Sequence, residues 1–242
     1  MNDEHLNKSI DIYGDNIGSV KLVQHWGDDS TVVRSARVSF GKDSDDNALS
    51  DRDKKLIQYL INHKHTSTLE HCGITFKFTV PLFVRSQHHR HRTWSYNEIS
   101  RRYTDVNIQF YEPVSFRTQH KSNRQASNID DNINPILSCG SNCSEAVSIH
   151  NQMSVDLYNK MLDSGVCREQ ARGVLPQNLY TEYYGSVNLG NLLKFIDLRI
   201  HEGSQWEIRK VAEACLSLSK ELFPHTISSY INNKEICDAL HK

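Results

Sequence analysis

Hydrophobic and polar residues alternate most regularly between positions 73 and 80. Ile74, Phe76, Phe78 and Val80 fall on one face of an extended chain, with polar residues between them. Alternation with a period of two is typical of a strand that buries one face. Shorter or more aromatic segments with a strand-like pattern predict three further strands, at residues 18–25, 106–111 and 180–187.

Apolar residues at helical spacing, together with capping residues, predict the helices. Ser50 followed by Asp53 and Ser204 followed by Glu207 have the spacing of capping boxes, and Asn188 precedes an apolar periodic run. A proline, which suits the first turn of a helix, stands just before residue 82. We therefore expect helices at residues 28–40, 50–63, 82–92, 149–165, 167–175, 188–200 and 204–222.

The order of these elements predicts an α+β fold. Strands and helices do not alternate in the β-α-β manner, and the second half of the chain is rich in helices. We expect a mixed sheet in a single domain over residues 1–242, because one domain of this length can bury a large core. Residues 117–143 are rich in Ser, Asn, Gln and Asp and are expected to form a polar surface excursion from that domain.

Composition disfavours several classes of protein. Of the 242 residues, 24% are charged, and the net charge is −1, whereas a general nucleic-acid binder would be basic. No apolar run approaches the ~18–20 residues of a membrane span, and the acidic, polar start lacks the apolar region of a secretory signal. The six cysteines are too scattered for a disulfide framework. We expect a cytoplasmic protein with free thiols and with no membrane or specific nucleic-acid partner.

The unusual feature is a cluster of histidine and arginine. Six of the 13 histidines lie between positions 63 and 91, and the five arginines between 85 and 102 are opposed there only by Glu98. Arg90 and Arg92 are separated by one residue, so their planar guanidinium groups can both bind phosphate oxygens. Glycine-rich phosphate-binding loops are absent from the sequence, so side chains and helix ends would have to hold a nucleotide. The alternative is a solvated basic face with one structural ion pair.

Two other kinds of chemistry receive weaker support. His63, His65 and His71, with Glu70, have a spacing that a zinc site could use, but histidines that face an anionic cofactor fit the neighbouring arginines better. Cys72 leads into the most regular strand, which favours a packing role over a nucleophilic one. We therefore expect no metal and no cysteine nucleophile.

The run RHRTWSYNEISRR, residues 90–102, resembles the signature of the flavin-dependent thymidylate synthases, which is R-H-R followed by seven residues and Ser. The resemblance extends over most of the chain. It leaves out the N-terminal tail, residues 117–143 and the last residues. The further matching segments are ARVSF (36–40), HTSTLEH (65–71), GITFKFTVPLFVRSQ (73–87), REQARGVLPQNLYTEYY (168–184) and NLLKFIDLRIHEGSQWEIR (191–209).

This resemblance implies a homotetramer of α+β subunits with FAD bound between chains. It implies methylation of dUMP to dTMP, with 5,10-methylenetetrahydrofolate as the one-carbon donor and NADPH as the reductant through the flavin. No cysteine nucleophile takes part in such a reaction. The rival hypothesis is non-enzymatic: a degenerate family member or an RNA-binding protein that uses the same basic cluster. A metal-dependent hydrolase is a more distant alternative.

The resemblance also implies roles for individual residues. Arg199 would stabilise charge on the uracil ring, because fixed donors in a dry site stabilise developing negative charge, and Ser100 would lie near the reacting base or its phosphate. Lys194 stands where the family commonly has Asn near the flavin. Flavin contacts are implied for His65, Ser67, Arg90, His91, Arg92, Glu98, Asn188, Leu189 and Gly190. Contacts with dUMP are implied for Gln87, Arg90, Glu98, Ile99, Ser100, Arg101, Arg102, Arg172 and Arg199.

Overall fold

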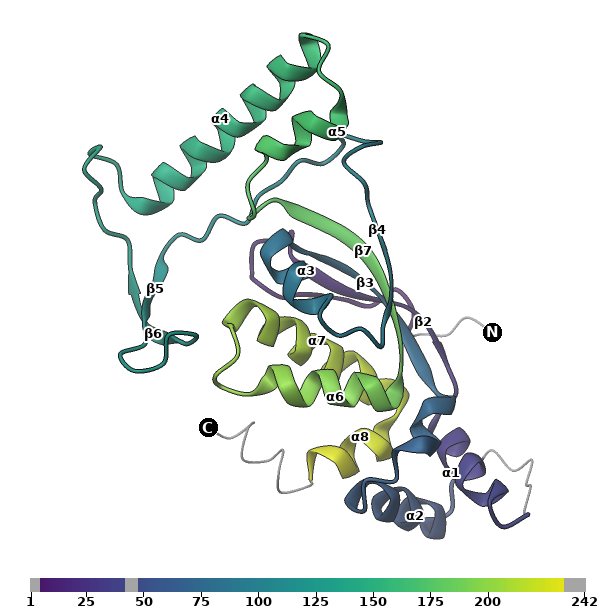
Figure 1. Ribbon diagram of the computed structural model, residues 1–242. Coiled ribbons are helices and arrows are strands. Elements are labelled where there is room, and N and C mark those ends of the chain that lie inside the picture. Colours follow the sequence, from purple (N-terminus) through teal and green to yellow (C-terminus); the bar gives the residue numbers. More distant parts are fainter. Residues whose placement is uncertain (1–4, 42–47, 233–242) are drawn as a thin grey trace.

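The strand predicted from the alternation lies at the centre of a sheet (Figure 1). A computed structural model describes residues 5–41 and 48–232 of the chain. In it, all four apolar residues of the alternating run are fully buried. Within the described residues the sheet has five strands in the order β1-β2-β3-β7-β4. They are β1 (Ser9–Asp11), β2 (Ser19–Trp26), β3 (Gly73–Pro81), β7 (Tyr180–Asn188) and β4 (Ser95–Glu98).

Every pair of neighbouring strands in this sheet is antiparallel, where we expected a mixed sheet. The connection between β2 and β3 shows the reason, because Trp26 at the end of one strand pairs with Gly73 at the start of the other. The chain therefore re-enters the sheet at the end from which it left, and such a connection gives antiparallel neighbours. The strands predicted at 18–25 and 180–187 are confirmed, and β1 and β4 were not predicted.

The strand predicted at 106–111 is wrong. In this segment only Phe110 forms a bridge, to Leu179. Asn107 has a φ of 55°, a left-handed conformation that cannot continue a strand. The Arg101 guanidinium also donates to the carbonyl groups of Val106 and Asn107, over 2.6 and 3.1 Å. This segment is therefore a turn whose carbonyl groups hold the side chain of Arg101.

Most of the predicted helices are present. Asp28, Ser50 and Asn188 act as N-caps, with side-chain oxygens that accept backbone N–H groups. The described helices and 3₁₀ turns are α1 (Asp29–Val38), α2 (Asp51–Asn62), η1 (Thr66–His71), α3 (Leu82–His88), α4 (Cys143–Asp163), α5 (Arg168–Ala171), η2 (Arg172–Val174), α6 (Leu189–Ile200), α7 (Trp206–Leu222) and α8 (Pro224–Ile231).

Several helix boundaries differ from the prediction. The helix expected over 149–165 begins earlier, at Cys143, and the one expected over 167–175 is the short α5 followed by the 3₁₀ turn η2. The capping box expected at Ser204 and Glu207 is wrong: α7 has Gln205 as its N-cap without a side-chain cap bond. Ser204 instead donates to the carbonyl of Leu198, and the Glu207 carboxylate binds Arg117. The helix expected over 82–92 ends at its seventh residue, and the chain then turns back toward β4.

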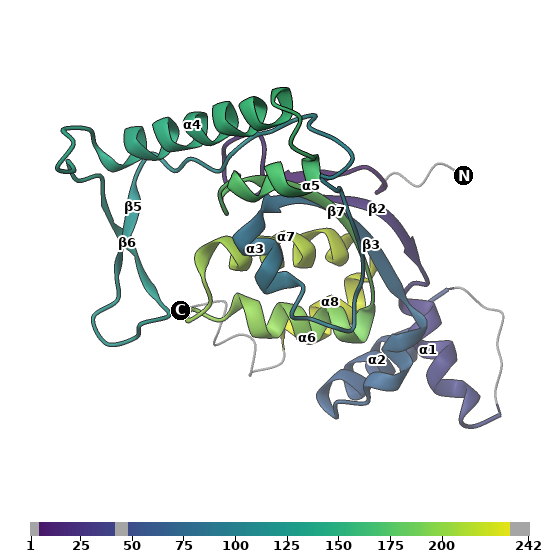
Figure 2. The same ribbon diagram turned by 45° about the horizontal axis from the view of Figure 1, so that its top comes forward.

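The polar excursion is more ordered than expected. It carries a hairpin of two antiparallel strands, β5 (Phe116–Gln119) and β6 (Ser127–Ile133), and α4 begins at the end of the excursion, at Cys143. Figures 1 and 2 show α3, α6 and α7 on one side of the sheet, with α4 and the hairpin set apart from α1 and α2. No helix among the described residues is long and apolar enough to cross a bilayer.

The apolar positions that predict α4 are Ile149, Met153, Leu157 and Met161. Met161 packs against a small second core, whereas the other three form an outward-facing stripe. Ile149, Met153 and Leu157 are 54%, 65% and 47% exposed. On the opposite side of the helix, Tyr158 is fully buried in this second core with residues from α5 and the loop before β7. The stripe is therefore a hydrophobic surface that nothing in the described chain covers.

Candidate functional site

The turn after α3 presents the R-H-R motif on the surface. His88 and Trp94 are buried among aromatic rings at the two ends of this turn. The Tyr96 hydroxyl donates to the His88 carbonyl over 2.9 Å and to the His91 carbonyl over 3.1 Å, which fixes the backbone between them. Arg90 and Arg92 point outward from this turn, and neither forms an ion pair with a described residue.

His91 connects the turn to α6. Its Nε2 accepts a hydrogen bond from the Nε of Arg199 over 3.0 Å. Burial, and then the Arg199 charge, lower the pKa of His91 to about 4, so the ring is neutral at pH 7 and can accept this bond. Burial also lowers the pKa of Arg199, which nevertheless stays charged at neutral pH. The neutral imidazole therefore holds the guanidinium of Arg199 in one orientation.

The residues that follow the turn line a polar cavity of about 420 Å³, here called the arginine pocket. Strand β4 pairs with β7, and residues 99–102, which follow β4, therefore lie beside η2. Six of the residues implied to bind dUMP lie together in this pocket. They are Glu98, Ile99, Ser100, Arg101, Arg102 and Arg172.

The charges of the arginine pocket are unequally balanced. Glu98 forms an ion pair with Arg85 over 3.1 Å and accepts the Thr181 hydroxyl over 2.7 Å. Arg102 and Arg172 form no ion pair with a described residue; Arg102 donates to a neighbouring tyrosine and Arg172 to a backbone carbonyl. The pocket therefore offers two unpaired guanidinium groups, which is a suitable arrangement for a phosphate. Arg101, in contrast, is already bound to the backbone of residues 106 and 107.

Gln87 and Arg199 lie outside the arginine pocket. Both line a larger cavity of about 850 Å³, here called the hairpin cavity, and the two cavities have no lining residue in common. Gln87 donates through Nε2 to Gln205, whose own amide donates to Glu207 over 2.9 Å. Eight of the nine implied dUMP-binding residues are thus divided between two cavities of one chain, and Arg90 lines neither of them.

Asn123 and Gln125, at the tip of the β5–β6 hairpin, also line the hairpin cavity. The sequence does not predict them as site residues, because they lie in a polar segment without periodicity. Neither an Asn-Gly turn nor clear alternation marks the hairpin, so no sequence signal could have placed this tip beside Arg199.

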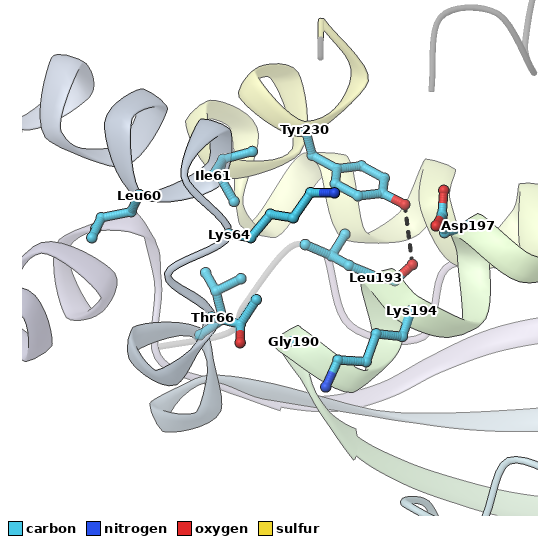
Figure 3. A pocket seen from close by; sticks show the side chains of 10 residues that line it. Leu60, Ile61, Lys64, Thr66, Gly190, Leu193, Lys194, Asp197 and Tyr230 are labelled. Atoms are coloured by element: carbon cyan, nitrogen blue, oxygen red, sulfur yellow. Dashed lines mark hydrogen bonds between the residues drawn. The ribbon is translucent and has the colours of Figure 1, made fainter. Parts of the chain in front are cut away.

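The N-terminus of α6 lies beside η1. Gly190 lines a cavity of about 360 Å³, here called the lysine pocket, with Lys64, Thr66 and Lys194. Figure 3 shows Lys64 extending toward the Tyr230 ring, whose hydroxyl donates to the Leu193 carbonyl over 3.1 Å. The remaining implied flavin residues nearby are His65 and Ser67, which are exposed on and before η1, Asn188, which caps α6, and Leu189, whose side chain is fully buried.

The described residues hold no group of three or more His, Cys, Asp and Glu arranged to bind a metal. His63 stacks on Tyr59 with 4.0 Å between ring centroids. Cys72 is buried, and burial raises the pKa of its thiol to about 12. Cys72 is therefore a protonated thiol at neutral pH.

Comparison with known proteins agrees with these features. The sequence profile of the family described as "Thymidylate synthase complementing protein" matches residues 21–225. A flavin-dependent thymidylate synthase of Thermus thermophilus is 41% identical over 213 residues, which cover 86% of this chain and 73% of the relative. The chain belongs to the flavin-dependent thymidylate synthases. Another family member, from Thermosipho melanesiensis, is 37% identical over 88% of this chain and 90% of its own length.

Solved structures confirm the α+β fold class. A UMP/dUMP methylase, PolB from Streptomyces cacaoi bound with 5-Br dUMP, superposes with a TM-score of 0.77 at 29% identity, covering 96% of this chain and 98% of that one. The same methylase bound with 5-Br UMP gives a TM-score of 0.75 at 30% identity, over 90% and 95% of the two chains. Membership of the flavin-dependent thymidylate synthases also confirms the expected enzyme class, a methyltransferase that depends on a flavin.

Proposed function

We propose that this chain methylates dUMP to dTMP, with 5,10-methylenetetrahydrofolate as the one-carbon donor and NADPH-reduced FAD as the hydride source. The observation that carries the proposal is the arginine pocket. There Arg102 and Arg172, from segments far apart in the sequence, converge without acidic partners beside the Ser100 hydroxyl. Two guanidinium groups can bind the phosphate of a nucleotide monophosphate through paired hydrogen bonds, and a neutral hydroxyl beside them can bind the rest of the ligand.

The base would lie against Arg199 and Gln87. The Arg199 guanidinium is oriented by His91, and a fixed donor of this kind stabilises negative charge on a pyrimidine carbonyl oxygen as the ring is activated for attack on the one-carbon unit. Ser100 would bind the substrate through its hydroxyl, beside the backbone of Ile99 and Arg101. The roles of all these residues stay proposals.

The residues around the R-H-R turn fit a flavin dinucleotide. Arg90 and Arg92 are exposed and without ion-pair partners among the described residues, as binding of a diphosphate requires. Asn188 caps the start of α6, where Gly190 lines the lysine pocket with Thr66, and His65 and Ser67 flank Thr66 in the chain. When bound, the flavin supplies the hydride that completes the methyl group; the protein residues bind it, orient the base and exclude water.

The five cysteines among the described residues support a mechanism without an enzyme thiolate; Cys237 lies outside those residues. Burial raises the pKa of Cys72 to about 12 and also raises the pKa of the fully buried Cys215. Cys139, Cys143 and Cys167 line none of the three cavities described above. A thiolate attack on the pyrimidine would need a low-pKa cysteine in one of these cavities.

We also propose that the active protein is a homotetramer with FAD between its subunits. The division of the dUMP residues between two cavities supports this, since a second copy could bring one chain's arginine pocket to another chain's hairpin cavity. The exposed stripe on α4 supports it as well, because an uncovered apolar surface of this kind marks an interface. The single-domain organisation and the cytoplasmic location stay predictions.

The assembly can be tested on the α4 stripe. Met153→Lys should give a smaller species than the wild type by light scattering, because it places a charge in the proposed interface. Asn159→Lys, at an exposed polar position of the same helix, is the matched control and should leave the assembly intact. A wild-type monomer of about 28 kDa with FAD fully bound would refute the proposed assembly.

The activity is tested by two measurements on the purified protein. The absorbance spectrum should show a bound oxidised flavin. Tritium should be released from dUMP labelled at carbon five when NADPH and methylenetetrahydrofolate are supplied. Retained flavin without tritium release would contradict the reaction, and the absence of both would favour a non-enzymatic, RNA-binding role for the basic cluster.

A further inference from the structure

Arg117 links the β5–β6 hairpin to α7. Arg117, at the start of the hairpin, donates through Nη2 to the Glu207 carboxylate over 2.6 Å and through Nε to the Ser127 hydroxyl over 3.0 Å. Its guanidinium also lies 5.2 Å from the centre of the Trp206 ring. Arg117 therefore attaches both strands of the hairpin to the first turn of α7.

The tip of the hairpin is an ordered turn. The Gln119 side-chain amide donates to the carbonyl groups of Asn123 and Ala126, over 3.1 and 2.9 Å. The Asn123 side-chain oxygen accepts the backbone N–H of Gln125 over 3.0 Å. These bonds hold the backbone of the tip, whereas the side-chain amide of Gln125 has no hydrogen-bond partner among the described residues.

One chain of hydrogen bonds connects the wall of the hairpin cavity to Arg117 at the base of the hairpin. Gln87 binds Gln205, Gln205 binds Glu207, and Glu207 binds Arg117. The contacts that hold Gln87 on the wall of the cavity thus also hold the base of the hairpin, whose tip residue Gln125 lines the same cavity. The Gln125 amide therefore lines the same cavity as Arg199 and has no hydrogen-bond partner among the described residues.

We propose that Gln125 is a further binding residue, which recognises the lactam edge of a planar heterocycle in the hairpin cavity. A primary amide presents one donor and one acceptor side by side. This arrangement pairs with an adjacent ring N–H and C=O through two hydrogen bonds, as amide side chains do with base edges. The inference rests on the proposed function, in which two ligands carry such an edge: the uracil of dUMP and the pterin of the folate donor.

The test measures the two ligands separately on the FAD-loaded protein. Equilibrium dialysis gives the affinity for labelled dUMP, and steady-state kinetics give the KM for methylenetetrahydrofolate. Gln125→Ala should weaken one of the two by about 10-fold, since two neutral hydrogen bonds are lost. Gln125→Glu should be at least as weak, because it replaces the donor by a second acceptor. Ser122→Ala, at an exposed position of the same tip, is the control and should match the wild type.

Each outcome either supports the proposed binding role of Gln125 or overturns it. A loss confined to dUMP affinity assigns Gln125 to the uracil, and a loss confined to the folate KM assigns it to the pterin. Both variants within twofold of the wild type for both ligands would overturn the proposal. If the wild type binds dUMP but releases no tritium, the proposed reaction fails while dialysis of dUMP and of the folate still tests Gln125. A wild type that binds neither ligand overturns both.

Discussion

Removal of Arg117 should destabilise the protein because it leaves a carboxylate buried without its cation. Glu207 has only 5% of its side chain exposed and accepts hydrogen bonds from Arg117, Tyr111 and Gln205. Breaking a buried ion pair by removing one partner costs ~3–5 kcal/mol. Since the Arg117 side chain is 21% exposed, water can partly replace it. We therefore expect Arg117→Met to lower the free energy of unfolding by about 3 kcal/mol, with a fall in Tm of roughly 6–12 °C for a chain of this size.

The Glu207→Gln substitution separates two causes of instability in Arg117→Met: an unpaired buried carboxylate and the loss of side-chain packing. Glu207→Gln removes the charge and keeps an acceptor for Tyr111, so the double variant with Arg117→Met should be more stable than Arg117→Met alone, by at least ~1 kcal/mol. The assay is urea denaturation of the flavin-free protein at one fixed concentration, because ligand and assembly shift apparent stability. Additive effects of the two substitutions, or a loss below ~0.5 kcal/mol for Arg117→Met, would refute the reasoning.

Three further predictions concern the proposed site. Arg199→Ala should lower dTMP formation by at least ~100-fold and leave NADPH-driven flavin reduction largely intact in a separate assay; Arg199→Lys should restore little, because a point charge does not reproduce a planar fork, and equal loss of both activities would contradict the role. Cys72→Ala in a folded, FAD-loaded preparation should retain most dTMP formation, because the pKa of this thiol is about 12; loss beyond that caused by destabilisation would restore a thiolate mechanism. The pKa of His91 is lowered in the fold to about 4, so between about pH 4 and 6.5 the unfolded state binds more protons and stability should fall as pH falls. His91→Asn should flatten part of that dependence in denaturation measured across this range, and an unchanged slope would contradict the assignment.

Local sequence signals predicted the parts of the fold in which pattern and packing agree. The alternation before Pro81 and the caps at Ser50 and Asn188 each act through neighbouring residues, and each is confirmed. The capping box at Ser204 was wrong because a distant residue, Arg117, takes the Glu207 carboxylate that the local pattern had assigned to the helix end.

The candidate site shows the same limit. The motif from Arg90 to Arg102 identified most of the basic cluster, and the structure brings six of the implied dUMP residues into one pocket. The sequence did not reveal that Gln87 and Arg199 face a different cavity, nor that Gln125 lies there with them. Those neighbours are set by the path of the hairpin and by α6, which depend on contacts between segments more than 70 residues apart.

The helix α6 connects two cavities at a fixed spacing. Gly190 lines the lysine pocket near its start, Asp197 lines both cavities, and Arg199 reaches the hairpin cavity near its end. At about 1.5 Å per residue, Asn188 and Arg199 are separated by about 16 Å along the axis. Insertion or deletion of one residue between them would change this length only slightly but would rotate Arg199 by about 100° around the helix and away from His91. Homologous enzymes that keep this geometry should therefore tolerate substitutions within α6 far better than any change in its length.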